Sequence, residues 1–184
     1  PGQTLRSQQG YWAFHPAPLP PELDWSADLI ALLSEADRAI TQLAEIGKTF
    51  PNPHIMVKPF VRREAVLSSR IEGTQTTLEE LYAYEAEQLS FLASRADAQE
   101  VHNYVRALTY GLERLDTLPV SKRLIRELHK QLIEGVRGER SNPGEFRQTQ
   151  NWIGPPGAPL DAATYVPPPP DSMHDALDHL ETFI

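Results

Sequence analysis

The sequence predicts an all-α fold, a helical bundle that carries one small β-hairpin. Over most of residues 1–134, apolar residues recur at helical spacing between capping residues and glycine or proline stops. Residues 135–170 are instead rich in glycine and proline and hold two short strand-like runs. With 184 residues, 40% of them hydrophobic, the chain is long enough to bury the core of one domain, or of one domain with a helical extension.

The first elements follow from capping and turn residues. Residues 1–25 predict an extended arm, because prolines forbid a regular helix there and aromatic residues offer anchors. Ser26 is a good N-cap for a helix that Gly47 ends. The next helix begins near Pro59, a favoured first-turn residue, and runs to Glu72.

The later elements carry similar signals. Thr76 with Glu79, and Thr77 with Glu80, each have the spacing of a capping box that opens a short helix. The remaining segments are expected as helices over 78–88, 98–115, 123–134 and from Asp171 onward, and as strands over 146–153 and 164–166.

The composition narrows the class of protein. A net charge of −8 argues against a nucleic-acid-binding surface. The absence of cysteine excludes disulfides, thiolate catalysis and cysteine-ligated zinc. No apolar run is long enough to span a bilayer, and no signal peptide opens the chain. We therefore expect a cytoplasmic protein with no nucleic-acid or membrane partner.

The end of the helix over residues 59–72 is the most informative feature of the chain. Glu72 puts a carboxylate at a helix C-terminus, where the helix dipole disfavours an anion by about 0.3–1 kcal/mol. Such a carboxylate is either aimed at a cation outside the helix or is an ordinary helix-end acid. In the second case it pairs with Arg62, Arg63 or Arg70.

Two neighbours of Glu72 complete this feature. Gly73 favours the left-handed conformation that stops a helix. Ser68 lies four residues before Glu72, on the same helix face. Its hydroxyl either makes a hydrogen bond that fixes the helix on another element, or it is a solvated or back-bonded helix serine.

Several stretches of the chain together resemble Fic-domain proteins, the enzymes that transfer AMP from ATP to protein hydroxyls. Ser-x-x-x-Glu-Gly at residues 68–73 is similar to the inhibitory motif of that family. Residues 50–74 resemble its N-terminal helical region, residues 100–108 the start of its core, and residues 144–170 its flap. The resemblance implies a Fic-like bundle.

The resemblance also implies two domains and a missing part. Residues 1–95 form the N-terminal arm and the helical region with the inhibitory motif, and residues 96–184 form the first part of a Fic-like domain, including the flap. The family's catalytic loop has the pattern His-x-Phe-x-Asp/Glu-Gly-Asn-Gly-x-Arg, or close variants, and none of the six histidines begins it. We therefore expect the chain to stop before that loop and to hold no catalytic residue.

The resemblance gives Glu72, Ser68 and Gly73 a regulatory role at the site of the ATP γ-phosphate. Glu72 pairs with an arginine of the missing loop and occupies the place of the γ-phosphate, so that ATP binds in a non-productive pose. The implied cofactors, ATP and Mg²⁺, are bound mainly by the missing loop. In some family members the same glutamate positions a water that removes AMP by hydrolysis.

The flap carries the expected contact with a target. Asn151, Trp152, Ile153 and Gly154 are expected to dock an extended segment of a target protein along a strand edge. In the alternative interpretation, Trp152 covers the core of an ordinary surface hairpin.

A last group of residues, His174, Asp175, Asp178 and His179, has the spacing of a metal cluster. A solvated helix face with charge pairing explains the same spacing, so we assign no metal site.

The resemblance therefore implies a protein adenylyltransferase of Ser, Thr or Tyr hydroxyls, autoinhibited by Glu72. The chain alone is expected to be inactive, and homodimer formation stays open. One alternative is a non-catalytic module that docks a protein partner with the flap. Another is removal of AMP from a modified protein by hydrolysis. Without the family resemblance, the sequence fits a helical adaptor domain.

Overall fold

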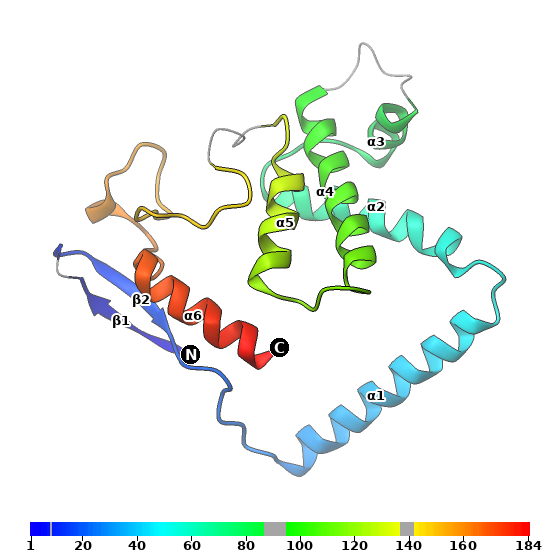
Figure 1. The fold of residues 1–184 in the computed structure, drawn as a ribbon, viewed down its shortest axis with the longest axis horizontal. Helices are drawn as coiled ribbons and strands as arrows, with labels where there is room; N and C mark the ends of the chain where they lie inside the picture. Colours follow the sequence, from blue (N-terminus) through cyan, green and yellow to red (C-terminus); the bar gives the residue numbers. More distant parts are fainter. Residues whose placement is uncertain (8, 87–94, 137–141) are drawn as a thin grey trace. The chain divides into compact units, whose positions relative to one another are not determined.

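The structure, a computed structural model, describes residues 1–7, 9–86, 95–136 and 142–184 (Figure 1). It is mostly helical, with one two-stranded antiparallel sheet. The elements are β1 (Gly2–Arg6), β2 (Trp12–Pro16), α1 (Ala27–Lys48), α2 (Pro53–Ile71), α3 (Leu78–Glu85), α4 (Arg95–Arg114), α5 (Lys122–Leu132), the 3-10 helix η1 (Leu160–Ala162) and α6 (Pro170–Phe183). The predicted class, all-α with one small hairpin, is confirmed.

The hairpin lies in the N-terminal segment, for which the sequence predicts an extended arm. β1 pairs with β2 so that Gly2 lies opposite Pro16 and Arg6 opposite Trp12. The turn is closed by a hydrogen bond of 2.7 Å from the Ser7 N–H to the Tyr11 carbonyl. The prolines that exclude a helix here do not exclude two short strands, because Pro16 ends β2 and takes no interior ladder position.

The hairpin predicted over 146–153 and 164–166 is reduced to one isolated bridge, between Ile153 and Tyr165. Longer strands are prevented by the sequence between these two residues. Prolines there have no N–H to donate to a ladder, and η1 occupies part of the connection.

The helix boundaries agree with the capping signals in part. The Ser26 hydroxyl accepts the Leu29 N–H at 3.2 Å and begins α1 as predicted, although the helix continues one residue past Gly47. α2 begins at Pro53, not at Pro59, which lies inside the helix. Both prolines suit a first turn, and Pro53 takes that position because the turn at Pro51 leads directly into it.

The capping box of α3 is formed by Thr77 and Glu80. The Thr77 hydroxyl accepts the Glu80 N–H at 3.2 Å, and the Glu80 carboxylate accepts the Thr77 N–H at 2.8 Å. Thr76, the other predicted cap, is buried instead. α6 begins at Pro170, so Asp171 lies in its first turn and is not its cap.

The chain divides into two compact units. One comprises Pro1–Glu22, Arg114–Lys130 and Gly144–Ile184, and the other comprises Leu23–Glu113 and Gln131–Pro143. The second unit has a core in which Ala65 and Val66 of α2 pack with Leu81 of α3 and with Val101 and Val105 of α4. This core fixes the end of α2, where the sequence places Glu72.

α1 buries none of its residues. Its apolar stripe is exposed, with Leu32 at 62%, Ile40 at 67% and Leu43 at 71%. None of the described helices is long and apolar enough to cross a membrane.

Candidate functional site

Glu72 lies directly after α2, as its C-cap residue. Its N–H donates to the Ser69 carbonyl at 3.1 Å, and its side chain is exposed. Within the described part of the chain, the Glu72 carboxylate makes no ion pair and no hydrogen bond. The C-terminus of α2 carries a partial negative charge, so the helix dipole disfavours an anion at this position. None of the described residues neutralises the carboxylate.

Gly73 stops α2 in the way the sequence predicts. Its φ of +93° lies in the left-handed region, its N–H donates to the Arg70 carbonyl at 3.1 Å, and the Thr74 N–H donates to the Ser69 carbonyl at 3.2 Å. These two bonds form a Schellman motif. The buried Thr74 hydroxyl also donates to the Ser69 carbonyl. The backbone on both sides of Glu72 is therefore fixed by hydrogen bonds.

Ser68 is half-buried, and its hydroxyl donates to the Glu64 carboxylate at 2.5 Å. This contact corresponds to neither of the ordinary alternatives, a solvated or a back-bonded serine. Because Glu64 and Ser68 are one helical turn apart on α2, the bond holds the Ser68 side chain along the face that leads to Glu72. The proposed role of Ser68, a bond to another element, stays a prediction.

The side chains beside Glu72 on α2 are apolar and exposed. Phe60 is 67% exposed, Leu67 is 46% exposed and Ile71 is 85% exposed. Their spacing of seven and four residues places them on one side of the helix. The uncompensated carboxylate therefore borders an apolar stripe of the same helix.

The arginines near Glu72 in sequence do not pair with it. Arg62 donates through Nε to the Glu85 carboxylate at 2.8 Å, and its guanidinium lies 5.6 Å from the centre of the Tyr82 ring. No ion pair of Arg63 or Arg70 is present among the described residues. The ordinary interpretation of Glu72, a surface ion pair with one of these three arginines, is not what the structure shows.

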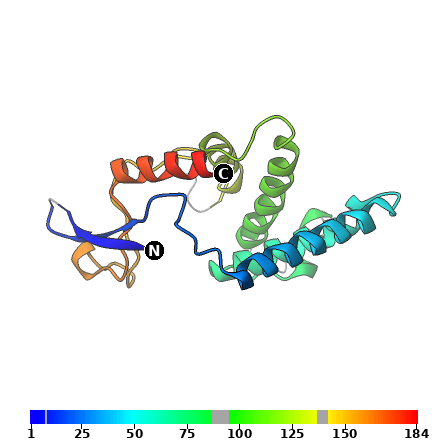
Figure 2. The same cartoon turned by 90° about the horizontal axis from the view of Figure 1, so that it is seen from below.

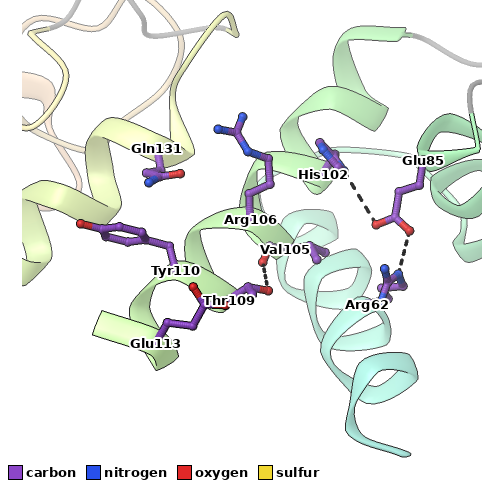
Figure 3. A pocket seen from close by; sticks show the side chains of 9 residues that line it. All are labelled: Arg62, Glu85, His102, Val105, Arg106, Thr109, Tyr110, Glu113 and Gln131. Carbon is purple, nitrogen blue, oxygen red and sulfur yellow. Dashed lines mark hydrogen bonds and ion pairs between the residues drawn. The ribbon is translucent and has the colours of Figure 1, made fainter. Parts of the chain in front are cut away.

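The pair of Arg62 and Glu85 lies at the edge of an open pocket of about 570 Å³ (Figure 3). His102 of α4 also points toward this carboxylate, with its Nδ1 3.8 Å from the Glu85 Oε1. Sequence reasoning missed this cluster, because α2, α3 and α4 each contribute one member and no local spacing connects them. It ties the three helices that carry the core.

The four predicted flap residues, Asn151 to Gly154, lie in the other unit and are all exposed. The Ile153 N–H donates to the Tyr165 carbonyl at 2.8 Å, and the Thr164 N–H donates to the Ile153 carbonyl at 2.8 Å. Ile153 is 66% exposed and Trp152 is 41% exposed, with its indole N–H on the Ala158 carbonyl at 3.0 Å. Trp152 thus lies on its own turn, and the interpretation in which it covers the core is not supported.

The base of the flap is held by two polar side chains that the sequence did not single out. Arg147 donates to the carbonyls of Thr149 and Pro168, and Gln150 donates to the Pro167 carbonyl at 3.0 Å. Burial lowers the pKa of the Arg147 guanidinium from its ordinary value. The proline run is thereby bound to the first half of the flap.

The suspected metal cluster on α6 is divided among other partners. Asp178 forms an ion pair with Lys122, and this hydrogen bond lowers the pKa of the Asp178 carboxyl and raises the pKa of Lys122. The His174 ring meets the Phe146 ring edge-on, with the centroids 5.8 Å apart. Among the described residues, no three His, Asp or Glu side chains gather closely enough to hold a metal ion.

The fold and this site define a class of protein. The chain is a helical protein in which a Schellman motif ends a helix beside a glutamate that pairs with none of the described residues, and it carries a short flap bound to a run of prolines. Residues 30–113 match the family model described as Fic/DOC family N-terminal. This match supports a Fic-domain protein of which residues 30–113 are the N-terminal part, and the Fic family generally transfers nucleotidyl groups to proteins. The matched range runs from α1 to α4 and includes Glu72.

Proposed function

We propose that these residues are the regulatory and target-docking part of a protein adenylyltransferase that Glu72 holds inactive. The observation that carries the proposal is that the Glu72 carboxylate has no partner among the described residues, while the Schellman motif fixes the backbone beside it, within the range of the family match. A carboxylate that the helix dipole disfavours and no neighbour neutralises is suited to a cation supplied from outside the described residues.

In this proposal the cation is an arginine of the catalytic loop, which lies outside residues 1–184. Glu72 occupies the position that the γ-phosphate of ATP needs, so the nucleotide binds in a pose that does not react. Two like charges about 4 Å apart at an effective dielectric constant near 20 repel each other by about 4 kcal/mol. A difference of that size corresponds to roughly a thousandfold change in the productive complex. One side chain is therefore sufficient as a switch.

The surroundings of Glu72 support this role. The exposed stripe of Phe60, Leu67 and Ile71 gives α2 an apolar face beside the carboxylate, suited to packing against a catalytic core. When packed, that face would orient Glu72 and keep water away from its partner. Low local dielectric strengthens the pairing of a carboxylate with a guanidinium.

The proposal is tested by incubating the complete gene product with labelled ATP and Mg²⁺ and comparing it with its Glu72→Gly variant. We expect covalent AMP on protein hydroxyls in the variant and little in the parent. Glu35→Gly serves as the matched control, because Glu35 is an exposed helix acid of α1. Equal labelling of the parent and Glu72→Gly would contradict the inhibitory role.

A second candidate, a docking module without chemistry of its own, is favoured by one observation. The catalytic pattern is absent from all six histidine positions of the chain, whereas the exposed flap is present. Absence of labelling in both the parent and Glu72→Gly would favour this candidate, or removal of AMP as the main activity. Release of AMP from a previously modified protein would indicate removal of AMP, and its absence would favour the docking module.

A further inference from the structure

The N-terminal hairpin does not stand alone. It contacts the flap at both of the flap's halves, within the same compact unit (Figure 2). The Tyr11 hydroxyl donates to the Gln150 side chain at 3.1 Å, and Gln150 in turn holds the Pro167 carbonyl. The Phe14 N–H donates to the Val166 carbonyl at 2.8 Å. One short hairpin thus bonds to the beginning and to the end of the flap.

The backbone bond of Phe14 extends the pairing of the flap by one strand. Tyr165 pairs with Ile153 on one side, and the adjacent Val166 accepts from β2. The Phe14 ring lies 6.1 Å from the Tyr165 ring at an angle of 42°. Ala13 is 1% exposed and Val166 is 8% exposed, so these two residues are buried at the junction, whereas Tyr165 is 42% exposed. A bridge as short as that of Ile153 needs such support to persist in water.

The sequence at the N-terminus suits this packing. A Cβ atom built on Gly2 would overlap the end of the Phe14 ring. The glycine opposite the end of β2 therefore leaves room for the ring to lie across β1. Trp12, two residues before Phe14 on the same strand, is 60% exposed.

We propose that the β1–β2 hairpin is a fixed brace for the flap, with Tyr11 and Phe14 as positioning residues. The hairpin bonds to the flap at Val166, on one outer edge. The other outer edge, formed by Trp152 and Gly154, stays open, and a partner strand docks there. In the described structure, the N–H groups of Trp152 and Gly154 donate to no protein acceptor. Because strand residues alternate in direction, the groups flanking Ile153 face away from Tyr165. This use of the edge rests on the proposed docking function, whereas the brace does not.

The brace is tested by hydrogen exchange of the full chain, read by mass spectrometry or NMR at single amides. In the parent, the amides of Ile153, Thr164 and Tyr165 should be protected, while those of Trp152 and Gly154 should exchange freely. Phe14→Ala should make the three protected amides exchange about three- to tenfold faster, because it removes an aromatic contact. Tyr11→Phe should give about a two- to fivefold increase, because it removes one hydrogen bond.

Two variants separate positioning from general damage. Trp12→Ala removes a larger ring from the same strand and should leave the flap amides unchanged. Phe14→Tyr keeps the ring and should restore protection. Unchanged exchange in Phe14→Ala, or an equal increase in Trp12→Ala, would overturn the brace. Protection of Trp152 and Gly154 in the parent would overturn the assignment of the open edge. Neither result depends on enzymatic activity, so a failure of the proposed function stays distinguishable.

Discussion

Replacement of Gly73 by alanine tests the claim that the backbone holds Glu72 in place. Nothing lies within 4 Å of a Cβ atom built on Gly73, so the substitution creates no clash. Its whole cost is conformational, because φ is +93° and an L-residue in the left-handed region loses about 1–2 kcal/mol. For a chain of this size that corresponds to a decrease in Tm of about 2–8 °C.

The assay is thermal and urea unfolding followed by circular dichroism. Gly47→Ala is the matched control, because nothing lies within 4 Å of its Cβ either and its backbone is helical. The same chemical change should therefore raise the free energy of unfolding there, by about 0.5–1 kcal/mol. Gly73→Asn should be milder than Gly73→Ala, since asparagine tolerates the left-handed region. An unchanged or higher Tm in Gly73→Ala would refute the reasoning.

Two further predictions concern side chains that join elements. Asn103 is 2% exposed and donates to the carbonyls of Leu132 at 3.1 Å and Glu134 at 2.8 Å. Asn103→Ala should lower the free energy of unfolding by about 2–3 kcal/mol, because both carbonyls lose their donor. Asn52→Ala, at an exposed cap without a side-chain bond, should change it little, and equal effects would contradict this account. For Asp178, the bond to Lys122 lowers the pKa below its ordinary 3.8, so its stabilising contribution is present above that pH and is lost as the pH falls through the lowered pKa. Asp178→Asn should therefore reduce the acid sensitivity of the unfolding midpoint below about pH 4, and an unchanged pH profile would count against the pair.

The sequence predicted best the features that a few adjacent residues decide. Ser26, the capping box of Thr77 and the stop at Gly73 all depend on hydrogen bonds between residues at most five positions apart. Local spacing in the sequence is therefore sufficient to predict these caps and this helix stop. The unpaired state of Glu72 was not decided by spacing, because Arg62 is taken by Glu85, which is 23 residues further on.

The features that the sequence did not predict depend on distant partners. β1 and β2 are short, and the prolines at and after the end of β2 led to the prediction of an extended arm without strands. The bond from Phe14 to Val166 and the bond from Tyr11 to Gln150 connect segments about 140–150 residues apart in sequence, which no periodicity encodes. The same reason explains why the flap was predicted as a hairpin of its own. Its pairing is completed by a strand from the other end of the chain.

The most direct test of the central claim compares rates of AMP transfer from labelled ATP for charge variants of Glu72 in the complete gene product. Glu72→Gln keeps the shape of the side chain and removes its charge, and Glu35→Gln makes the same change at an exposed acid of α1. The account predicts that Glu72→Gln is activated nearly as strongly as Glu72→Gly, by up to about a thousandfold, while Glu35→Gln behaves like the parent. Activation by Glu72→Gly but not by Glu72→Gln would contradict control by the carboxylate charge, and no activation in either would contradict inhibition by Glu72.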